Sequence, residues 1–121
     1  MKESKLVNGY KAIERLYANK LPMQDAFRIY NLKSAIKEIY NFQMEQELKI
    51  IAENHGERKE NGDLSFPTEL DFARFRDAIL ELNEVELDVQ VEPVVLRMDH
   101  IQNIEISPAD IEALEGFVFF E

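Results

Sequence analysis

The sequence predicts an α+β fold that is mostly α: a long N-terminal helical hairpin, a third helix, short antiparallel strands and a short C-terminal helix. Two patterns support this fold class. Apolar residues recur every three or four positions over most of residues 4–82, as in amphipathic helices. After residue 84 they alternate with polar residues, as in a half-buried strand. Because 121 residues are enough for one hydrophobic core, we expect a single domain over residues 1–121.

The helical hairpin is expected within residues 1–56. Its first helix, over about residues 4–18, is supported by apolar residues at helical spacing: Val7, Tyr10, Ile13 and Tyr17. An alternative is a shorter helix capped by Asn8, because Gly9 is unfavourable inside a helix. Pro22 ends this element, since the residue before a proline avoids the helical conformation.

The second helix is expected over residues 23–54, which contain neither glycine nor proline. Ile29, Tyr40 and Ile51 are eleven residues apart and therefore lie on one face of a nearly straight helix. About thirty residues form a rod about 45 Å long. A small core does not cover such a rod, so we expect part of it to pack against another chain. Gly56 is expected to end the helix in a left-handed conformation.

Residues 57–121 are expected to form an acidic helix–strand–helix part. Asn61-Gly62 predicts a turn, and a very short strand is expected at Leu64 and Phe66. Thr68 is suited to cap a third helix over about residues 69–82, which we expect to pack across the apolar face of the hairpin. The alternating residues that follow predict a strand over residues 85–91, which Pro93 interrupts.

The end of the chain predicts a short helix and a docked tail. Ser107 followed by Pro108 is typical of a helix start, and Gly116 is expected to end this helix. The apolar residues 117–120 are expected to dock on the core or on a partner. The predicted core residues are Ile13, Leu16, Leu32, Ile36, Ile39, Phe72, Phe75, Ile79, Leu82, Leu87, Val89, Ile111 and Leu114.

Composition excludes several classes of protein. The absence of cysteine excludes disulfide scaffolds, thiolate metal sites and cysteine nucleophiles. The four glycines form no phosphate-binding loop. A net charge of −10 argues against direct binding of nucleic acid. No apolar run reaches the roughly 18 residues that a membrane span needs, so we expect a soluble protein without membrane contact.

The two histidines give little support for an active site. His55 lies at a predicted helix end, and the adjacent Asp99 and His100 are the only pair that suggests a metal or general-base site. No third ligand at zinc-type spacing accompanies this pair, so a surface loop is the simpler interpretation. A carboxylate-based metal enzyme at Asp99 and His100 is a weaker alternative. We expect no enzymatic activity, no resident metal and no cofactor.

Four segments carry a resemblance to a group of proteins. They are Tyr-Ala-Asn-Lys-Leu-Pro at residues 17–22, Glu-Asn-Gly-Asp at residues 60–63, Glu-Val-Glu-Leu-Asp-Val-Gln-Val-Glu-Pro at residues 84–93, and Ile-Ser-Pro-Ala-Asp-Ile-Glu-Ala-Leu at residues 106–114. In their order and pattern they resemble small uncharacterised proteins of tailed phages and prophages of Gram-positive bacteria. The resemblance implies a phage or prophage origin, and it transfers no active-site residue.

The first functional hypothesis is a non-catalytic phage or prophage protein that acts through protein–protein interaction, in virion assembly or as an accessory factor in the host-cell cytoplasm. A homo-oligomer is expected, because residues 1–58 hold ten basic and eight acidic residues whereas residues 59–121 hold four and sixteen. Such halves can pair between subunits. The candidate partner-binding residues are Ile29, Ile36, Tyr40, Met44, Leu48, Phe117, Phe119 and Phe120.

The alternative hypothesis is an acidic inhibitor of a host nucleic-acid-binding or defence protein. Its carboxylates would imitate the closely spaced phosphate charges of DNA. Arg74 and Arg76 fall inside the acidic row that starts at Asp71, and they weaken this interpretation. The candidate acidic face consists of Asp77, Glu81, Glu84, Glu86, Asp88 and Glu92.

Overall fold

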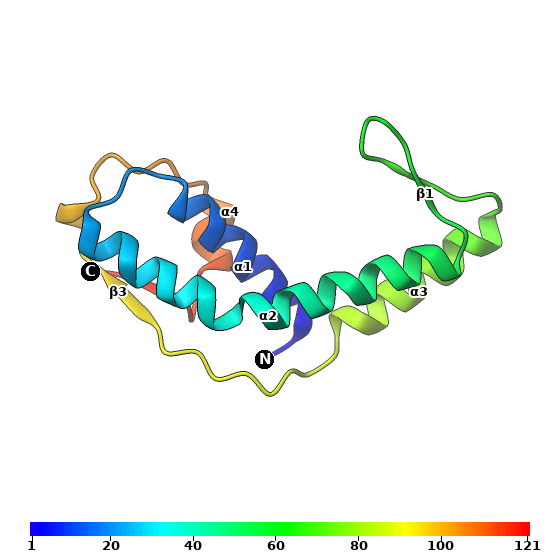
Figure 1. The fold of residues 1–121 in the computed structure, drawn as a ribbon, viewed down its shortest axis with the longest axis horizontal. Helices are drawn as coiled ribbons and strands as arrows, with labels where there is room; N and C mark the ends of the chain where they lie inside the picture. The colour runs from blue at the N-terminus through cyan, green and yellow to red at the C-terminus, as the bar shows by residue number, and fades with distance from the viewer.

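A computed structural model describes residues 1–121 and confirms the mostly helical α+β fold class. Helix α1 (Glu3–Tyr17) and helix α2 (Met23–Glu53) form the N-terminal hairpin. Helix α3 (Glu69–Asn83) lies beside the second half of α2, and the short helix α4 (Pro108–Ala113) packs on α1 (Figure 1). None of the helices combines the length and the apolarity required to cross a bilayer.

The hydrophobic core is confined to one end of the molecule, which we call the body. It joins one side of α1, the first half of α2 and the last quarter of the chain. No residue of α3 is buried. The fully buried large side chains are Leu6, Ile13, Leu16, Ile29, Ile36, Leu96, Leu114 and Phe117.

The rest of the chain forms an arm, which consists of the second half of α2 (residues 38–53), the hairpin β1–β2 and α3. Figure 1 shows α3 running back along α2 while the hairpin projects from the tip. The arm buries Ile51 and Gln43 but has no separate apolar core. The third helix was expected to cross the apolar face of the α1–α2 hairpin. It lies instead mainly along the extension of α2 that α1 leaves uncovered.

Two pairs of short strands are present. Strand β1 (Glu57–Arg58) and strand β2 (Leu64–Ser65) are antiparallel around the predicted Asn61-Gly62 turn. Strand β3 (Val94–Leu96) and strand β4 (Val118–Phe120) are parallel, with Val94 paired to Val118. The apolar tail is therefore the second strand of a two-stranded sheet, and this pair is parallel rather than antiparallel.

The predicted strand over residues 85–91 is not part of a sheet. Its burial alternates from residue 86 onward, with Leu87, Val89 and Val91 half-buried and their neighbours exposed, whereas Val85 is 42% exposed. Only one bridge, between Lys2 and Glu86, pairs it with another segment. The alternation predicted which side chains face the body, but no second strand lies alongside to complete a ladder.

Local capping signals are largely confirmed. The hydroxyl groups of Thr68 and Ser107 accept hydrogen bonds from the backbone N–H groups three residues later, at Asp71 and Asp110. At the end of α2 the left-handed residue is His55, with φ of 61°, and not Gly56 as expected. A side chain at Gly56 would come within 3.0 Å of Phe66 and Ile51, so close packing requires the glycine there.

Two predicted core residues lie on the surface. Phe72 is 49% exposed and Ile111 is 51% exposed. Phe75, Ile79 and Leu82 on α3 are only half-buried, because α1 and α2 cover one side of α3 and nothing covers the other. Ile39, Leu87 and Val89 are also half-buried, whereas Ile13, Leu16, Leu32, Ile36 and Leu114 belong to the core as predicted.

Candidate interaction surfaces

Three of the predicted partner-binding residues lie in the core instead of on the surface. Ile29 and Phe117 are fully buried, and Ile36 is 1% exposed. The apolar stripe on α2 is therefore turned inward along its first half, against α1. Because a core and an interface require the same apolar residues, the helical period alone did not distinguish them.

The other five predicted residues are at least partly accessible. Leu48 is 61% exposed and Phe119 is 52% exposed, whereas Met44 and Phe120 are half-buried. The ring of Tyr40 is stacked on that of Tyr10, with 4.0 Å between the ring centroids. Burial raises the pKa of both tyrosine hydroxyls, so this pair belongs to the contact between α1 and α2.

One side of α2 is exposed along most of the helix, and we call it the outer face. At one end it adjoins Tyr17, the last residue of α1. Tyr30 and Leu48 are eighteen residues apart, which is five helical turns, and both lie on this side. They are 51% and 61% exposed, and Met23 and Phe27 beside Tyr30 are more than half exposed. The outer face thus has exposed apolar side chains at both ends and polar residues between them.

The aromatic end of the outer face is hollowed. A shallow cavity of about 320 Å³ is lined only by apolar residues: Tyr17, Met23, Ala26, Phe27 and Tyr30. The ammonium group of Lys33 lies 5.4 Å from the centre of the Tyr17 ring and 4.0 Å from the carboxylate of Glu14. A cationic group therefore borders an apolar hollow at this end.

The molecule exposes more surface than a globular monomer of its size. Its accessible surface is 8396 Å². A compact monomer of 14.2 kDa is expected to expose about 6,800 Å², which is about 1,600 Å² less. The excess follows from the shape in Figure 1, where the arm extends beyond the body with water on most sides.

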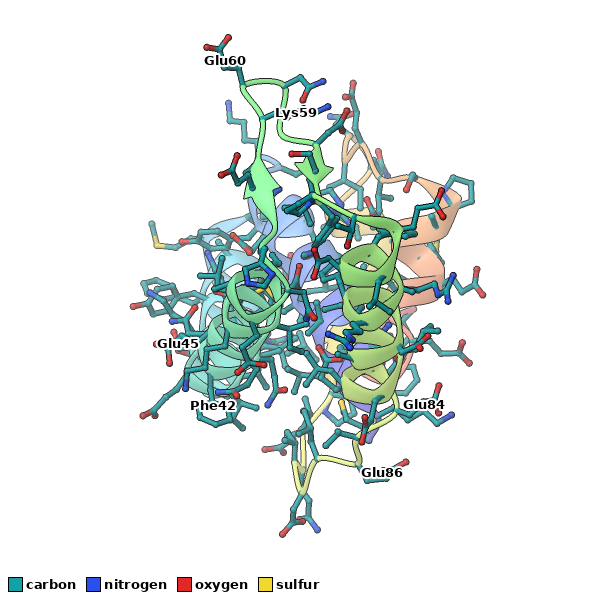
Figure 2. All side chains as sticks on the ribbon, turned by 90° about the vertical axis from the view of Figure 1, so that its right-hand side faces the viewer. Phe42, Glu45, Lys59, Glu60, Glu84 and Glu86 are labelled. Carbon is teal, nitrogen blue, oxygen red and sulfur yellow. The ribbon has the colours of Figure 1, made fainter.

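The predicted acidic face is exposed but partly neutralised. Asp77, Glu81 and Glu84 lie on one side of α3, since they are four and three residues apart. The ammonium group of Lys2 is 2.8 Å from Glu84, and this contact raises the pKa of Lys2. The amino terminus is 3.4 Å from Glu86, which Figure 2 shows next to Glu84.

The remaining acidic candidates are Asp88 and Glu92 in the extended segment. Both side chains are exposed, and neither has a basic group within salt-bridge distance. They therefore lie apart from the α3 row, and no basic group of the chain pairs with them.

The two histidines lie beside different carboxylates. Asp99 pairs with Arg97 at 2.9 Å, and His100 instead lies 3.9 Å from the buried carboxylate of Asp25. His55 is 3.3 Å from Asp71, whose pKa is lowered first by the hydrogen bond from Thr68 and then by His55. No three histidine, aspartate or glutamate side chains converge as a ligand set for a metal ion.

Comparison with protein-family models, with curated proteins and with solved structures gave no match.

Met23, Phe27 and Tyr30 were not among the predicted partner-binding residues. Their signal was present in the sequence, because the eighteen-residue spacing of Tyr30 and Leu48 places both on one side of a helix without breakers. The sequence did not show which side of that helix α1 covers.

Proposed function

We propose that this chain is a non-catalytic protein of phage or prophage origin that acts through protein–protein interaction, and that it self-associates through the outer face of α2. The observation that carries the proposal is the exposed apolar side chains at both ends of one face of a 31-residue helix. Helices with such faces commonly associate by burying them against a second helix.

A two-fold pairing of α2 with itself accounts for the position of these residues. With the axis near residue 39 and the helices antiparallel, Tyr30 of one copy lies opposite Leu48 of the other, and the same contact repeats at the far end. The aromatic hollow of each body then receives the arm of its partner. This arrangement closes the assembly at two copies.

Charge favours the same antiparallel pairing. Residues 1–37 contain eight basic and three acidic residues, whereas residues 38–84 contain five basic and twelve acidic residues. Antiparallel α2 helices place the basic first part of one copy beside the acidic arm of the other. Parallel pairing would instead place like charges side by side.

The excess surface is large enough for a stable dimer. A standard protein–protein interface buries about 800 Å² on each partner, and obligate dimers bury more. The excess of about 1,600 Å² on each chain falls in the obligate range. A dimer that buried this area would leave each chain with the exposed surface of a compact monomer of its size.

A charge-exchange experiment tests the pairing by sedimentation velocity. Tyr30→Glu and Leu48→Lys should each give a monomer, because each places a charge against an apolar side chain at both ends of the interface. The double variant should recover the dimer, since Glu at position 30 would face Lys at position 48 of the other copy.

Leu70→Lys, on the exposed side of α3, is the matched control and should leave the dimer intact. A monomeric wild-type chain at high concentration would refute self-association, and a double variant no better than the singles would refute this geometry.

The biological setting is proposed from the resemblance to small phage and prophage proteins together with this interaction surface. Affinity purification of the tagged chain from phage-infected cells, followed by mass spectrometry, tests it. Capsid or tail components would support a role in virion assembly. Recovery of a host nuclease or polymerase would instead support an acidic inhibitor, although three of its six candidate carboxylates pair with cations of the same chain.

A further inference from the structure

Residues 88–93 are extended and make no hydrogen bonds to the rest of the chain. Burial alternates from residue 88 to residue 92, as in a strand, and Pro93 is exposed. None of their backbone N–H or C=O groups has a partner within the protein. The segment is anchored at both ends, where Leu87 N–H donates to Met1 at 2.7 Å and Val94 N–H donates to Phe117 at 2.9 Å. A strand held in place with unpaired edges is a template for another extended chain.

A groove runs between this segment and α2. It has a volume of about 440 Å³ and is lined by two stretches of chain: Arg28, Asn31, Leu32 and Ala35 on α2, and residues 90–95. The guanidinium group of Arg28 reaches across to the carbonyl oxygen of Val95 at 3.4 Å and marks one end of the groove. Phe42, seven residues beyond Ala35, lies on the same side of α2 and is 55% exposed (Figure 2).

Beyond Leu87 both edges of the segment lack partners, and we call the one away from the amino terminus the free edge. Residues 85 and 87 exchange backbone hydrogen bonds with residues 1–3. Since N–H and C=O groups of alternate residues point to opposite edges of a strand, those of residues 88, 90 and 92 point away from that pairing. Three donors and three acceptors are thereby available to a chain that lies alongside.

We propose that this groove binds an extended peptide of another protein by strand addition to residues 88–93, and that the peptide alternates apolar and basic residues. Main-chain hydrogen bonds to the free edge would hold the peptide, and its alternate side chains would set the specificity. Side chains on one face of the peptide meet the apolar floor formed by Leu32, Ala35 and Val91. Those on the other face lie beside Asp88 and Glu92, which have no cationic partner in this chain.

Charge excludes a second copy of this segment as the favoured occupant. In an antiparallel self-pairing centred on Gln90, Asp88 of each copy would lie opposite Glu92 of the other. Like charges directly opposite each other destabilise a strand pair. The groove is also distinct from the outer face of α2, so the proposal does not depend on self-association.

The test uses the ¹⁵N-labelled full chain and a capped seven-residue peptide of alternating lysine and valine. Binding should shift the amide signals of residues 88, 90 and 92 and slow their hydrogen exchange. A glutamate–valine peptide of the same length should bind at least about tenfold more weakly, because it reverses every charge beside Asp88 and Glu92. A lysine–valine peptide methylated on alternate backbone nitrogens should lose most of its affinity, since it cannot complete the ladder.

A pair of variants separates the site from general attraction to an acidic protein. Asp88→Lys with Glu92→Lys should weaken binding of the lysine–valine peptide about tenfold. Glu112→Lys with Glu115→Lys changes the net charge equally at exposed positions near α4 and should leave binding unchanged. Equal weakening by both pairs, or equal binding of both peptides, would overturn the proposal. A further result would overturn the proposal: without peptide, the amides of residues 88–93 become protected from hydrogen exchange only when the chain dimerises. The edge would then belong to a second copy.

Discussion

Gly9, in the middle of α1, lies against the ring of Phe117 at the other end of the chain. A Cβ atom on Gly9 would lie 2.8 Å from each of two carbons of this ring and closer still to a third. Phe117 is fully buried, and its carbonyl oxygen accepts the hydrogen bond from Val94 that begins the β3–β4 sheet. The glycine therefore lets the tail dock on α1, although glycine weakens an isolated helix.

Gly9→Ala is expected to lower the free energy of unfolding by about 1–3 kcal/mol, because the added methyl group overpacks the core. This reverses the effect of an ordinary glycine-to-alanine change inside a helix, which is a gain of about 1 kcal/mol. Urea denaturation measures the change. Asn8→Ala, at the exposed neighbouring position, is the control and should be neutral or slightly stabilising. A more stable Gly9→Ala variant would show that the Phe117 ring moves aside without cost.

Gly9 illustrates which parts of the fold could be predicted from the sequence. Signals that depend on neighbouring residues were confirmed, such as the caps at Thr68 and Ser107 and the long unbroken α2. The parallel pairing of Val94 with Val118 depends on where two distant segments meet, and no local pattern contains that information. For the same reason Gly9 looked like a possible helix boundary until its packing partner was known.

For the candidate surfaces too, local patterns were predicted and the packing of distant segments was not. The apolar stripe of α2 was predicted, but Ile29 and Ile36 belong to the core while Tyr30 and Leu48 remain exposed. Which side of the stripe is covered depends on how α1 lies across it. The alternation of acidic and apolar residues in the extended segment was also predicted. Its unpaired edge was not, because the sequence does not show which backbone groups lack a hydrogen-bond partner.

Glu3 gives an expected pH dependence of stability. Its side chain is buried in the first turn of α1, and one carboxylate oxygen has no hydrogen-bond partner. Burial first, and then repulsion from Glu47, raise its pKa above the usual 4.5, while Lys11 opposes the shift. The folded chain thus holds this proton more tightly than the unfolded chain, so the stability it contributes is lost as pH rises from about 4.5 through the raised pKa.

Glu3→Gln should remove that loss and stabilise the protein at pH 7 by about 1 kcal/mol, with little change near pH 4. Urea denaturation at both pH values measures the difference. Glu112→Gln, at an exposed position, is the control and should have no pH-dependent effect. An equal effect of Glu3→Gln at both pH values would contradict the assignment of a buried, proton-binding carboxylate.

The contact of Arg15 with Asp110 should have the opposite pH dependence. The guanidinium nitrogens lie 2.6 and 2.8 Å from one oxygen of the Asp110 carboxylate, which also belongs to the capped first turn of α4. The hydrogen bond from Arg15 is the main reason that the pKa of Asp110 is lowered from 3.8. The associated stability is present above about pH 4 and is lost as pH falls through the lowered value.

Asp110→Asn should therefore cost about 1.5–3 kcal/mol at pH 7, as expected for a hydrogen bond to a charged group, and clearly less at pH 2. Thermal unfolding at the two pH values measures this change. Asp99→Asn breaks the pair with Arg97, in which both side chains are more than half exposed, and should cost under about 1 kcal/mol. Similar losses for the two variants would mean that the docking of α4 does not depend on the buried carboxylate.

Phe75 and Phe117 form a matched pair for comparing the arm with the body. The sequence placed Phe75 in the core, where truncation to alanine costs about 3–5 kcal/mol. Its ring is only half-buried and lies 4.8 Å from that of Phe66, whereas Phe117 has no exposed surface. In the monomeric Tyr30→Glu background we expect Phe75→Ala to cost about 1–2 kcal/mol and Phe117→Ala to cost the full amount. Urea denaturation measures both losses. Equal losses would mean that the arm is packed as well as the body and unfolds together with it. The exposed apolar surface of the arm would then not need a second copy to stabilise it.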